Sequence, residues 1–528
     1  MGADLHRQRW LIALFGVGVL AVVARAAMTS AVWSLPDRYL LNADSAQYHH
    51  YALVLAGLVK GELPRIFDLS PLATLWGALW HSLFGPSPQA VIIPQILILG
   101  SGTALLVASS ARRLAGTSAG VAAGVLVAIC EPLVFYDCAV LATPLAVFLA
   151  AATLHATLLS AERPTLIRCA GLGLLTGLWI VCRPNTLLFV PVALAIVAFP
   201  RLEPGALSRW ARTVVLVGCT VAPVLPFTIT NAVRGDAFVP VTSSAGINLF
   251  IGNNQGATGR LESVFGEHSA AESLAVFRDK AEQTEGRPLD AAEVSSFWID
   301  QTWHEIADDP ERFAALLGKK LAYGVNDFEA PDSWNIPFLE TELPPVASWL
   351  PGFGLLLALG LPGLILLWRR GPPGRRAVHG TCGVALITML AFFVAGRYRA
   401  PMIPALAIAA GATLSWIAER IQALTAETFG RRNERLRQRA ARGLAGAAVL
   451  VALAANNSNL PILESRDDIE LERLARALAS EQRYDEALDR IERLFDLAQA
   501  SHDDAMYERA SQTARELIPV TLKNEQLQ

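Results

Sequence analysis

The sequence predicts an all-α polytopic membrane protein with about eleven transmembrane helices. Two observations support this fold class. First, 53% of the residues are hydrophobic and only 17% are charged, whereas an average soluble domain carries about 25% charged residues. Second, the apolar residues are gathered in blocks long enough to cross a bilayer, which takes roughly 20 residues of helix. In a soluble chain they would instead recur at the spacing of amphipathic helices and strands.

Eleven apolar blocks are the predicted spans. They cover residues 10–33, 89–110, 117–136, 139–160, 166–182, 185–200, 212–232, 346–368, 377–395, 401–419 and 442–456. The fifth and sixth blocks are short and separated only around Pro184, so one broken helix is an alternative. Loop charge decides between the two counts, because basic residues concentrate in cytoplasmic loops. A fused helix would place the arginine cluster at 369–376 on the outer side, so eleven spans fit the charge pattern.

The N-terminal block is expected to remain in the protein as its first span. It runs from Trp10 to about Val32 and follows two arginines, Arg7 and Arg9. This is longer than the apolar core of a signal peptide, which has roughly 7–15 residues. We therefore expect a multi-pass protein of the plasma (inner) membrane, with a cytoplasmic N-terminus and an extracytoplasmic C-terminal tail.

Two hydrophilic regions within the transmembrane domain are expected on the outer side, at residues 34–88 and 233–345. The first contains semi-apolar stretches at 45–60 and 72–84, too short to span, which suit helices lying at the interface. The second begins with a strand-like, Gly/Asn-rich stretch from Phe238 to Gly259. Amphipathic patterns then predict helices at about 268–285, 290–306 and 309–323. The insert is therefore expected to be small, mixed and mostly helical.

The chain divides into a transmembrane domain, residues 1–456, and a hydrophilic tail, residues 457–528. The tail has apolar residues at helical spacing in 469–480 and 484–498, and its segment Arg483 to Leu488 looks like half of a tetratricopeptide unit. Such repeats need about three copies to bury a core. The alternative is a helical hairpin that packs on its own protein or on a partner protein.

Composition and motifs exclude several classes of function. The net charge of −3 gives no reason to expect a nucleic-acid partner. The six cysteines lie in or beside apolar blocks without metal-ligand spacing, and the adjacent residues His49 and His50 would not face one another on a helix. The sequence has no nucleotide-binding glycine loop or Walker motif. We expect no cofactor; a divalent metal stays an open alternative that the ligand spacing does not support. Without a nucleotide motif, any donor used outside the cytoplasm must be activated in another way, and a polyprenyl phosphate sugar fits that requirement.

Two acidic residues near apolar boundaries are candidates for catalysis. Asp44 follows the first span and precedes a helix-like run. It could cap that helix, or it could accept a proton from an acceptor hydroxyl at the membrane surface. Asp137 lies in the second outer loop, where an ionisable group is costly unless it is paired or solvated. The alternative for Asp137 is simple placement among the lipid headgroups.

Basic residues are scarce on the outer side, which makes Lys60, Arg183, Arg397 and Arg399 candidates for binding a lipid phosphate. Arginine suits phosphate because its planar fork donates two hydrogen bonds at once. The Arg397-Tyr398-Arg399 motif faces the outer surface between two spans, where a lipid phosphate would lie. The alternative is interfacial anchoring, with Tyr398 in the aromatic belt.

Several of these segments together resemble the dolichyl-phosphate-mannose protein mannosyltransferase-like superfamily. That superfamily includes the family 39 glycosyltransferases and the aminoarabinose and other lipid A sugar transferases, and it has the GT-C fold. The resemblance covers most of residues 1–420, and the order and sidedness of its motifs make the combination specific. The motifs are Asp44 to Tyr48, Ser70-Pro71-Leu72, Gly177-Leu178 through Asn185, Phe238 to Val241 leading into Gly246 to Asn254, and Arg397 to Pro401.

The resemblance implies an inverting glycosyltransferase with a GT-C-like transmembrane domain. Asp44 would be the general base, Arg397 and Arg399 would hold the donor phosphate, and contacts to donor or acceptor would come from Tyr48, Asn253 and Asn254. Relatives commonly have Thr-Glu-Pro where this chain reads Ala142-Thr143-Pro144, so the role of that Glu is lost or passes to Asp137. Bacterial relatives with the Gly-Asn-Asn segment often carry tetratricopeptide-like tails.

The partners implied are a polyprenyl-phosphate sugar, the lipid bilayer and an acceptor that is a protein, a lipid or a polysaccharide. Two alternatives remain open. One is a transporter or flippase of a lipid-linked intermediate, although such proteins usually show internal repeats, which this sequence lacks. The other is a non-catalytic envelope assembly protein that recruits partners through its tail.

Overall fold

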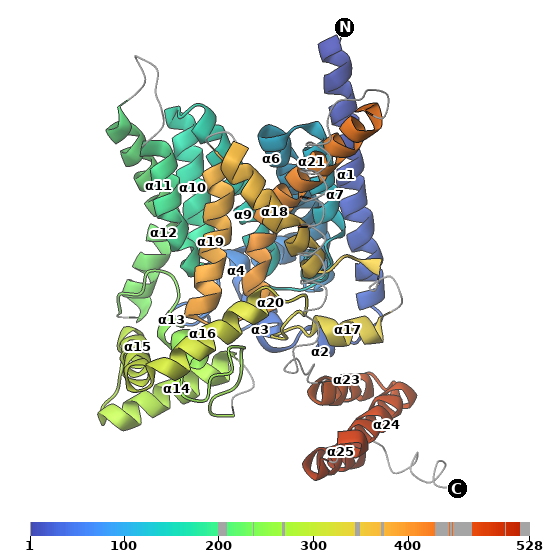
Figure 1. The fold of residues 1–528 in the computed structure, drawn as a ribbon. Helices are drawn as coiled ribbons and strands as arrows, with labels where there is room; N and C mark the ends of the chain where they lie inside the picture. The colour runs from blue at the N-terminus through green and yellow to red at the C-terminus, as the bar shows by residue number, and fades with distance from the viewer. Residues whose placement is uncertain are drawn as a thin grey trace.

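A computed structural model describes residues 2–198, 208–235, 237–266, 270–343, 349–370, 374–427, 443, 446, 467–501 and 503–517. Apolar helices form a bundle, and the helical loop regions lie at one end of it (Figure 1). Within these residues, five helical stretches are long and apolar enough to cross a membrane, and four shorter apolar helices accompany them. These helices support a multi-pass membrane protein.

The described helices of the bundle coincide with the first ten predicted spans. They are α1 (Gly2–Val32), α5 (Gln89–Pro94) with η1 (Gln95–Gly100) and α6 (Ser101–Ala115), α7 (Thr117–Ile129), α9 (Thr143–Glu162), α10 (Leu166–Cys182), η2 (Pro184–Phe189) with α11 (Val190–Ala198), α12 (Arg209–Gly235), α18 (Phe353–Arg370), α19 (Arg375–Ala391), and α20 (Gly396–Arg399) with η4 (Ala400–Met402) and α21 (Ile403–Glu427). The short α8 (Glu131–Tyr136) follows α7. The predicted span at 442–456 lies outside the described residues, apart from Gly443 and Gly446.

Small residues let the apolar helices approach closely, as is usual between helices in membranes. A Cβ atom at Gly177 would lie 2.2 Å from the carbonyl oxygen of Thr220, so α10 packs against α12 only with glycine there. After α10 the chain breaks at Arg183, which is extended (φ −144°, ψ 100°). The break has a local cause, since Pro184 disfavours a helical conformation in the residue before it.

Helical elements from three parts of the chain lie together at one end of the bundle, which we call the loop face. Figure 1 places the insert and the tail at this end, opposite the N-terminus. The first loop contributes α2 (Asp37–Leu40), α3 (Ala43–Leu55) and α4 (Pro71–Phe84). The insert contributes α13 (Ala245–Asn253), α14 (Ala270–Glu285), α15 (Ala291–Asp308), α16 (Pro310–Gly324) and α17 (Ile336–Glu342). Helices occur at the two positions predicted in the first loop and at the three predicted in the insert, while the interfacial placement of the first two stays a prediction.

The strand-like prediction for the start of the insert is wrong. Residues 245–253 form helix α13, and the described part of the chain contains only an isolated bridge between Arg260 and Val394. The glycines of this segment serve close packing. A Cβ atom at Gly246 would lie 2.0 Å from Ser295 O, and one at Gly252 would lie 1.9 Å from Phe392 O. The insert is therefore mostly helical where it is described, with non-helical segments such as 254–266 and 325–335 between its helices.

The described part of the tail forms three helices, α23 (Asp467–Ser480), α24 (Tyr484–Ser501) and α25 (Asp504–Leu517). The first two coincide with the predicted pair, and the sequence analysis missed α25. Apolar residues of all three helices are buried between them, among them Leu474, Ile491 and Ala510. The similarity of the tail to tetratricopeptide repeats stays a prediction.

Candidate functional site

A cavity of about 1050 Å³ lies at the loop face, where the ends of the spans meet the loop regions. Its walls come from the first loop, the break after α10, the insert, the tail and the Arg397-Tyr398-Arg399 motif in α20, which we call the α20 motif. The lining includes Asp44, Tyr48, Asp68, Arg183, Asp332, Arg397 and Tyr398. It therefore brings together five of the residues singled out from the sequence, Tyr398 among them, and adds two carboxylates that were not predicted as site residues.

Asp44 lies in the first turn of α3 and is buried. Its Oδ2 atom accepts a hydrogen bond from Nη1 of Arg397, which forms an ion pair between the first loop and the α20 motif. The residue before it, Ala43, has a positive φ of 42°, an uncommon conformation for any residue other than glycine. The side chain of Asp44 is thus directed to Arg397 and not used as a helix cap.

Arg397 lies between two carboxylates. Besides Asp44, its Nε atom is 3.4 Å from Oδ2 of Asp332, and its Nη1 atom is 3.3 Å from Oγ of Ser333. Asp332 belongs to the segment 325–335, which we call the strap and which connects α16 to α17. Burial raises the pKa of Asp332, while the neighbouring Arg397 lowers it. The backbone N–H of Trp334 also donates to Oδ1 of Asp332 at 3.1 Å, so the ion pair and this hydrogen bond together favour the ionised carboxylate.

Arg183 lies near Arg397 at the end of the cavity beside the spans. It occupies the extended break after α10, where its Nη2 donates to Oγ1 of Thr143 at 3.1 Å. The guanidinium centres of Arg183 and Arg397 lie 5.4 Å and 5.6 Å from the centre of the Tyr398 ring, within the range of cation–π attraction. The same residues also line a narrow pocket between α10 and α19, with Trp179, Val384 and Ala385. The two arginines thus stand between the cavity and the apolar bundle.

Arg399 and Lys60 do not line the cavity. Arg399 is buried and donates to the strap: to the carbonyl oxygens of Asn326 and Phe328, and to Oε1 of Glu329. Its guanidinium lies 3.9 Å from the centre of the Phe353 ring. Lys60 is exposed beyond the end of α3. In this structure Arg399 fixes the strap that carries Asp332.

Asp137 lies away from the cavity, among helices of the bundle. It pairs with Nε of Arg25, whose side chain is fully buried in α1. Arg25 also donates to the carbonyl oxygen of Ala128 at 2.9 Å, and Gln95 donates to the carbonyl oxygen of Asp137 at 2.9 Å. These contacts connect α1, η1 and the segment after α8. The observed contacts of Asp137 therefore hold helices of the bundle together.

Asn253 and Asn254 also lie outside the cavity lining. The side chain of Asn253 donates to Ala391 O at 2.7 Å and accepts from Nζ of Lys320 at 2.7 Å. Asn254 accepts from the backbone N–H of Gly256 at 2.9 Å. Tyr48, by contrast, does line the cavity, and its hydroxyl accepts from the backbone N–H of Ser70 at 3.1 Å. Asn253 attaches the insert to the end of α19, whereas the side-chain hydrogen bonds of Asn254 stay within residues 250–256.

The burial of Lys320 predicts a pH dependence of the insert. Burial lowers the pKa of Lys320 from 10.5 to about 7, so between these values the unfolded chain binds a proton that the folded insert does not. Stability should therefore rise as the pH is raised from about 7 toward 10.5. Melting temperatures measured at pH 7, 8 and 9 should show this rise in the wild type and a smaller one in Lys320→Met. Parallel curves for the two proteins would contradict the prediction.

Asp68 and Asp332 are the cavity carboxylates that sequence reasoning missed. Asp68 accepts from Nε2 of Gln47 at 2.6 Å and from the Tyr51 hydroxyl at 3.3 Å, and burial raises its pKa. Its position just before the Ser70-Pro71-Leu72 motif was an available signal. Asp332 gave none, because nothing local in the sequence connects it to Arg397. Among the described residues, no group of three or more His, Cys, Asp or Glu side chains is placed to hold a metal ion.

Comparison with known proteins supports the resemblance noted from the sequence. Residues 68–227 match the model of the family described as dolichyl-phosphate-mannose-protein mannosyltransferase. The matched part includes Asp68 and Arg183, whereas Asp44 and Arg397 lie outside it. No curated protein sequence matches the chain.

Several solved structures are similar to this chain at low identity. The Archaeoglobus fulgidus oligosaccharyltransferase tethered to an acceptor peptide is 15% identical over 90% of this chain and 58% of that one, with a TM-score of 0.47. AglB from the same organism, in complex with an inhibitory peptide and a dolichol-phosphate, is 13% identical over 91% and 59%, with a TM-score of 0.40. ArnT from Cupriavidus metallidurans, bound to undecaprenyl phosphate, is 15% identical over 80% and 81%, with a TM-score of 0.34. The chain spans about 58% of the length of the oligosaccharyltransferase.

Proposed function

We propose that this protein is a membrane glycosyltransferase, which transfers a sugar from a polyprenyl-phosphate donor to an acceptor hydroxyl at the loop-face cavity. The observation that carries the proposal is the placement of Asp44 and two arginines in one cavity, where the loop regions meet the apolar spans. The family match over residues 68–227 supports the same class of enzyme. The loop charges of the sequence favour the extracytoplasmic side for this face.

The donor would enter from the bilayer, with its phosphate held by Arg183 and Arg397. Guanidinium groups bind phosphate oxygens through charge-assisted hydrogen bonds. The two groups flank Tyr398 and border the narrow pocket between α10 and α19. In this arrangement the phosphate lies at the arginines, the first part of the lipid chain lies against the apolar pocket, and the sugar points into the cavity.

Asp44 is the proposed general base. As the acceptor oxygen attacks C1 of the sugar, Asp44 takes the hydroxyl proton, the bond between C1 and the phosphate oxygen breaks, and the phosphate leaves with the electron pair. One displacement of this kind inverts C1. Arg397 pairs with Asp44 and is also held by Asp332, so it can contact the donor phosphate while it stays beside the base.

The deciding experiment is transfer of labelled sugar by the purified protein. In detergent or vesicles, the protein should move label from a polyprenyl phosphate sugar to a water-soluble or lipid acceptor in an envelope extract. A flippase would move the donor across a vesicle bilayer without cleaving it, and an assembly protein would do neither. Either of these outcomes would overturn the proposal.

Arg183→Gln should weaken donor binding. Among the described residues Arg183 pairs with no carboxylate, so its removal leaves no buried acid without a partner and the fold should survive. Hydrogen bonds to charged groups contribute about 1.5–3 kcal/mol each, so the donor Kd should rise about 10- to 100-fold. Titration with polyprenyl phosphate measures the change, and Lys60→Gln is the matched control. Equal affinity in Arg183→Gln and Lys60→Gln would remove Arg183 from the phosphate site.

A further inference from the structure

The tail helices form one wall of the cavity that holds Asp44. The lining continues from the first loop and the strap to tail residues, among them Ile469, Arg473, Arg476 and Arg509. The cavity thus extends from Arg183 and Arg397, at the ends of the spans, to α23 and α25. A donor from the bilayer occupies the end beside the spans, so the end beside the tail is left for the acceptor.

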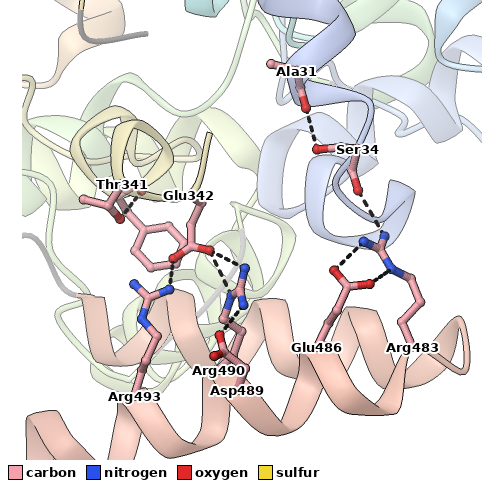
Figure 2. A network of polar contacts seen from close by, with 10 residues as sticks. Ala31, Ser34, Thr341, Glu342, Arg483, Glu486, Asp489, Arg490 and Arg493 are labelled. Atoms are coloured by element: carbon pink, nitrogen blue, oxygen red, sulfur yellow. Dashed lines mark hydrogen bonds and ion pairs between the residues drawn. The ribbon is translucent and has the colours of Figure 1, made fainter. Parts of the chain in front are cut away.

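The tail is attached to the loop face through a buried carboxylate. Figure 2 shows Glu342, the last residue of α17, between two arginines of α24. Arg490 approaches Oε2 of Glu342 through Nη2 at 2.8 Å and Nε at 2.9 Å, and Arg493 pairs with Oε1. The Glu342 side chain is only 1% exposed. Two guanidinium groups on one buried carboxylate specify a single docked position for α24.

The first loop holds the tail at two further points. The Tyr39 hydroxyl of α2 donates to Oε2 of Glu470 in α23 at 2.9 Å, and both groups are buried. Arg483, just before α24, donates to the carbonyl oxygen of Ser34 at 3.0 Å while pairing with Glu486 (Figure 2). These contacts place α23 at the cavity in a defined orientation. The wall that it forms therefore has a defined position relative to the first loop.

Two arginines of this wall retain unused donors. Among the described residues, Arg473 donates only to Glu470, at 3.3 Å, and Arg509 only to Asp468, at 2.8 Å. Their side chains stay 37% and 48% exposed. Arg476 differs, because Glu472, Glu516 and Thr513 occupy its nitrogens. Each guanidinium has five N–H donors in a fixed fork, so Arg473 and Arg509 can bind a further anion.

We propose that α23 and α25 are the acceptor-binding wall of the enzyme, and that Arg473 and Arg509 bind an anionic group, carboxylate or phosphate, on the acceptor. The inference rests on the proposed transferase function and adds the class of acceptor. The acceptor arrives from the aqueous side, its anionic group is held at the tail, and its hydroxyl reaches Asp44 on the opposite side of the cavity. Arg473 and Arg509 position the acceptor and do not contact the donor.

The test separates acceptor use from donor use in Arg473→Gln/Arg509→Gln. The probes are a labelled polyprenyl phosphate sugar and an envelope extract separated by anion exchange into acidic and neutral fractions. In the wild type, label should appear in acidic material. In the variant, the KM for the acidic fraction should rise about tenfold or more, as expected when charged hydrogen bonds are lost. Slow hydrolysis of the donor by water should be unchanged.

Controls separate this inference from the proposed function. Arg287→Gln removes an exposed arginine of the insert, outside the cavity, and should behave as wild type. Glu342→Arg should repel Arg490 and Arg493, release the tail and give the same selective loss of acceptor use. Transfer to neutral material alone, or an unchanged KM in the double variant, would overturn the acceptor wall while leaving the transferase intact. Absence of both transfer and hydrolysis in the wild type would overturn the transferase itself.

Discussion

Asp44→Asn is expected to lower sugar transfer by about 10²–10⁴-fold, the usual contribution of a positioned general base, while the protein stays folded. The amide keeps the shape of the carboxylate and can still accept a hydrogen bond from Arg397. Arg397 also keeps its second partner, Asp332. Donor affinity should therefore persist, because only the group that removes the acceptor proton is lost. Initial rates of transfer and a donor titration, made on the same preparation, measure the two effects separately.

Asp37→Asn is the matched control for this prediction. Asp37 lies in the same loop, is exposed and does not line the cavity, so its rate should equal that of the wild type. Full transfer activity in Asp44→Asn would remove Asp44 from the mechanism. A loss of activity together with a loss of donor binding would assign Asp44 to the phosphate site through Arg397, and not to proton transfer.

Asp137→Ala is expected to destabilise the protein by about 3–5 kcal/mol, the usual result of removing one partner of a buried ion pair. Arg25 is fully buried and would keep its positive charge without a carboxylate beside it. The sequence assigns Asp137 a catalytic role, whereas its contacts predict a role in holding α1 against the bundle. Thermal unfolding in detergent measures the stability, and transfer by the folded fraction measures the activity.

The double variant Arg25→Met/Asp137→Leu tests the physical reason. Replacing both members of a buried pair by apolar residues of similar size is often neutral or stabilising, so most of the lost stability should return. If Asp137→Ala unfolds at the wild-type temperature and yet loses transfer, the catalytic assignment from the sequence would stand. If the double variant is less stable than Asp137→Ala, the ion pair is not the source of the destabilisation.

Much of the architecture could be predicted from the sequence, because the signals are local. Apolar blocks determined the helices of the bundle, and amphipathic spacing determined α14, α15 and α16 in the insert. The strand-like prediction for the Gly/Asn-rich stretch 238–259 is wrong, because residues 245–253 form a helix. In the structure, Gly246 and Gly252 allow a helix to pack closely against Ser295 and Phe392. Whether a glycine allows close helix packing depends on which backbone atoms lie next to it in the fold. A local sequence pattern does not reveal those neighbours.

The candidate site was only partly predictable, for the same reason. The sequence by itself determined that this is a membrane protein with a helical loop face, and it identified Asp44, Arg183 and Arg397 as unusual charges near apolar boundaries. Only the tertiary structure decided their partners. Asp44 and Arg397 are 353 residues apart, and Asp137 and Arg25 are 112 apart. Burial of a charge is costly wherever it occurs, so a sequence reveals that a partner is needed, while the packing of distant helices determines which one it is.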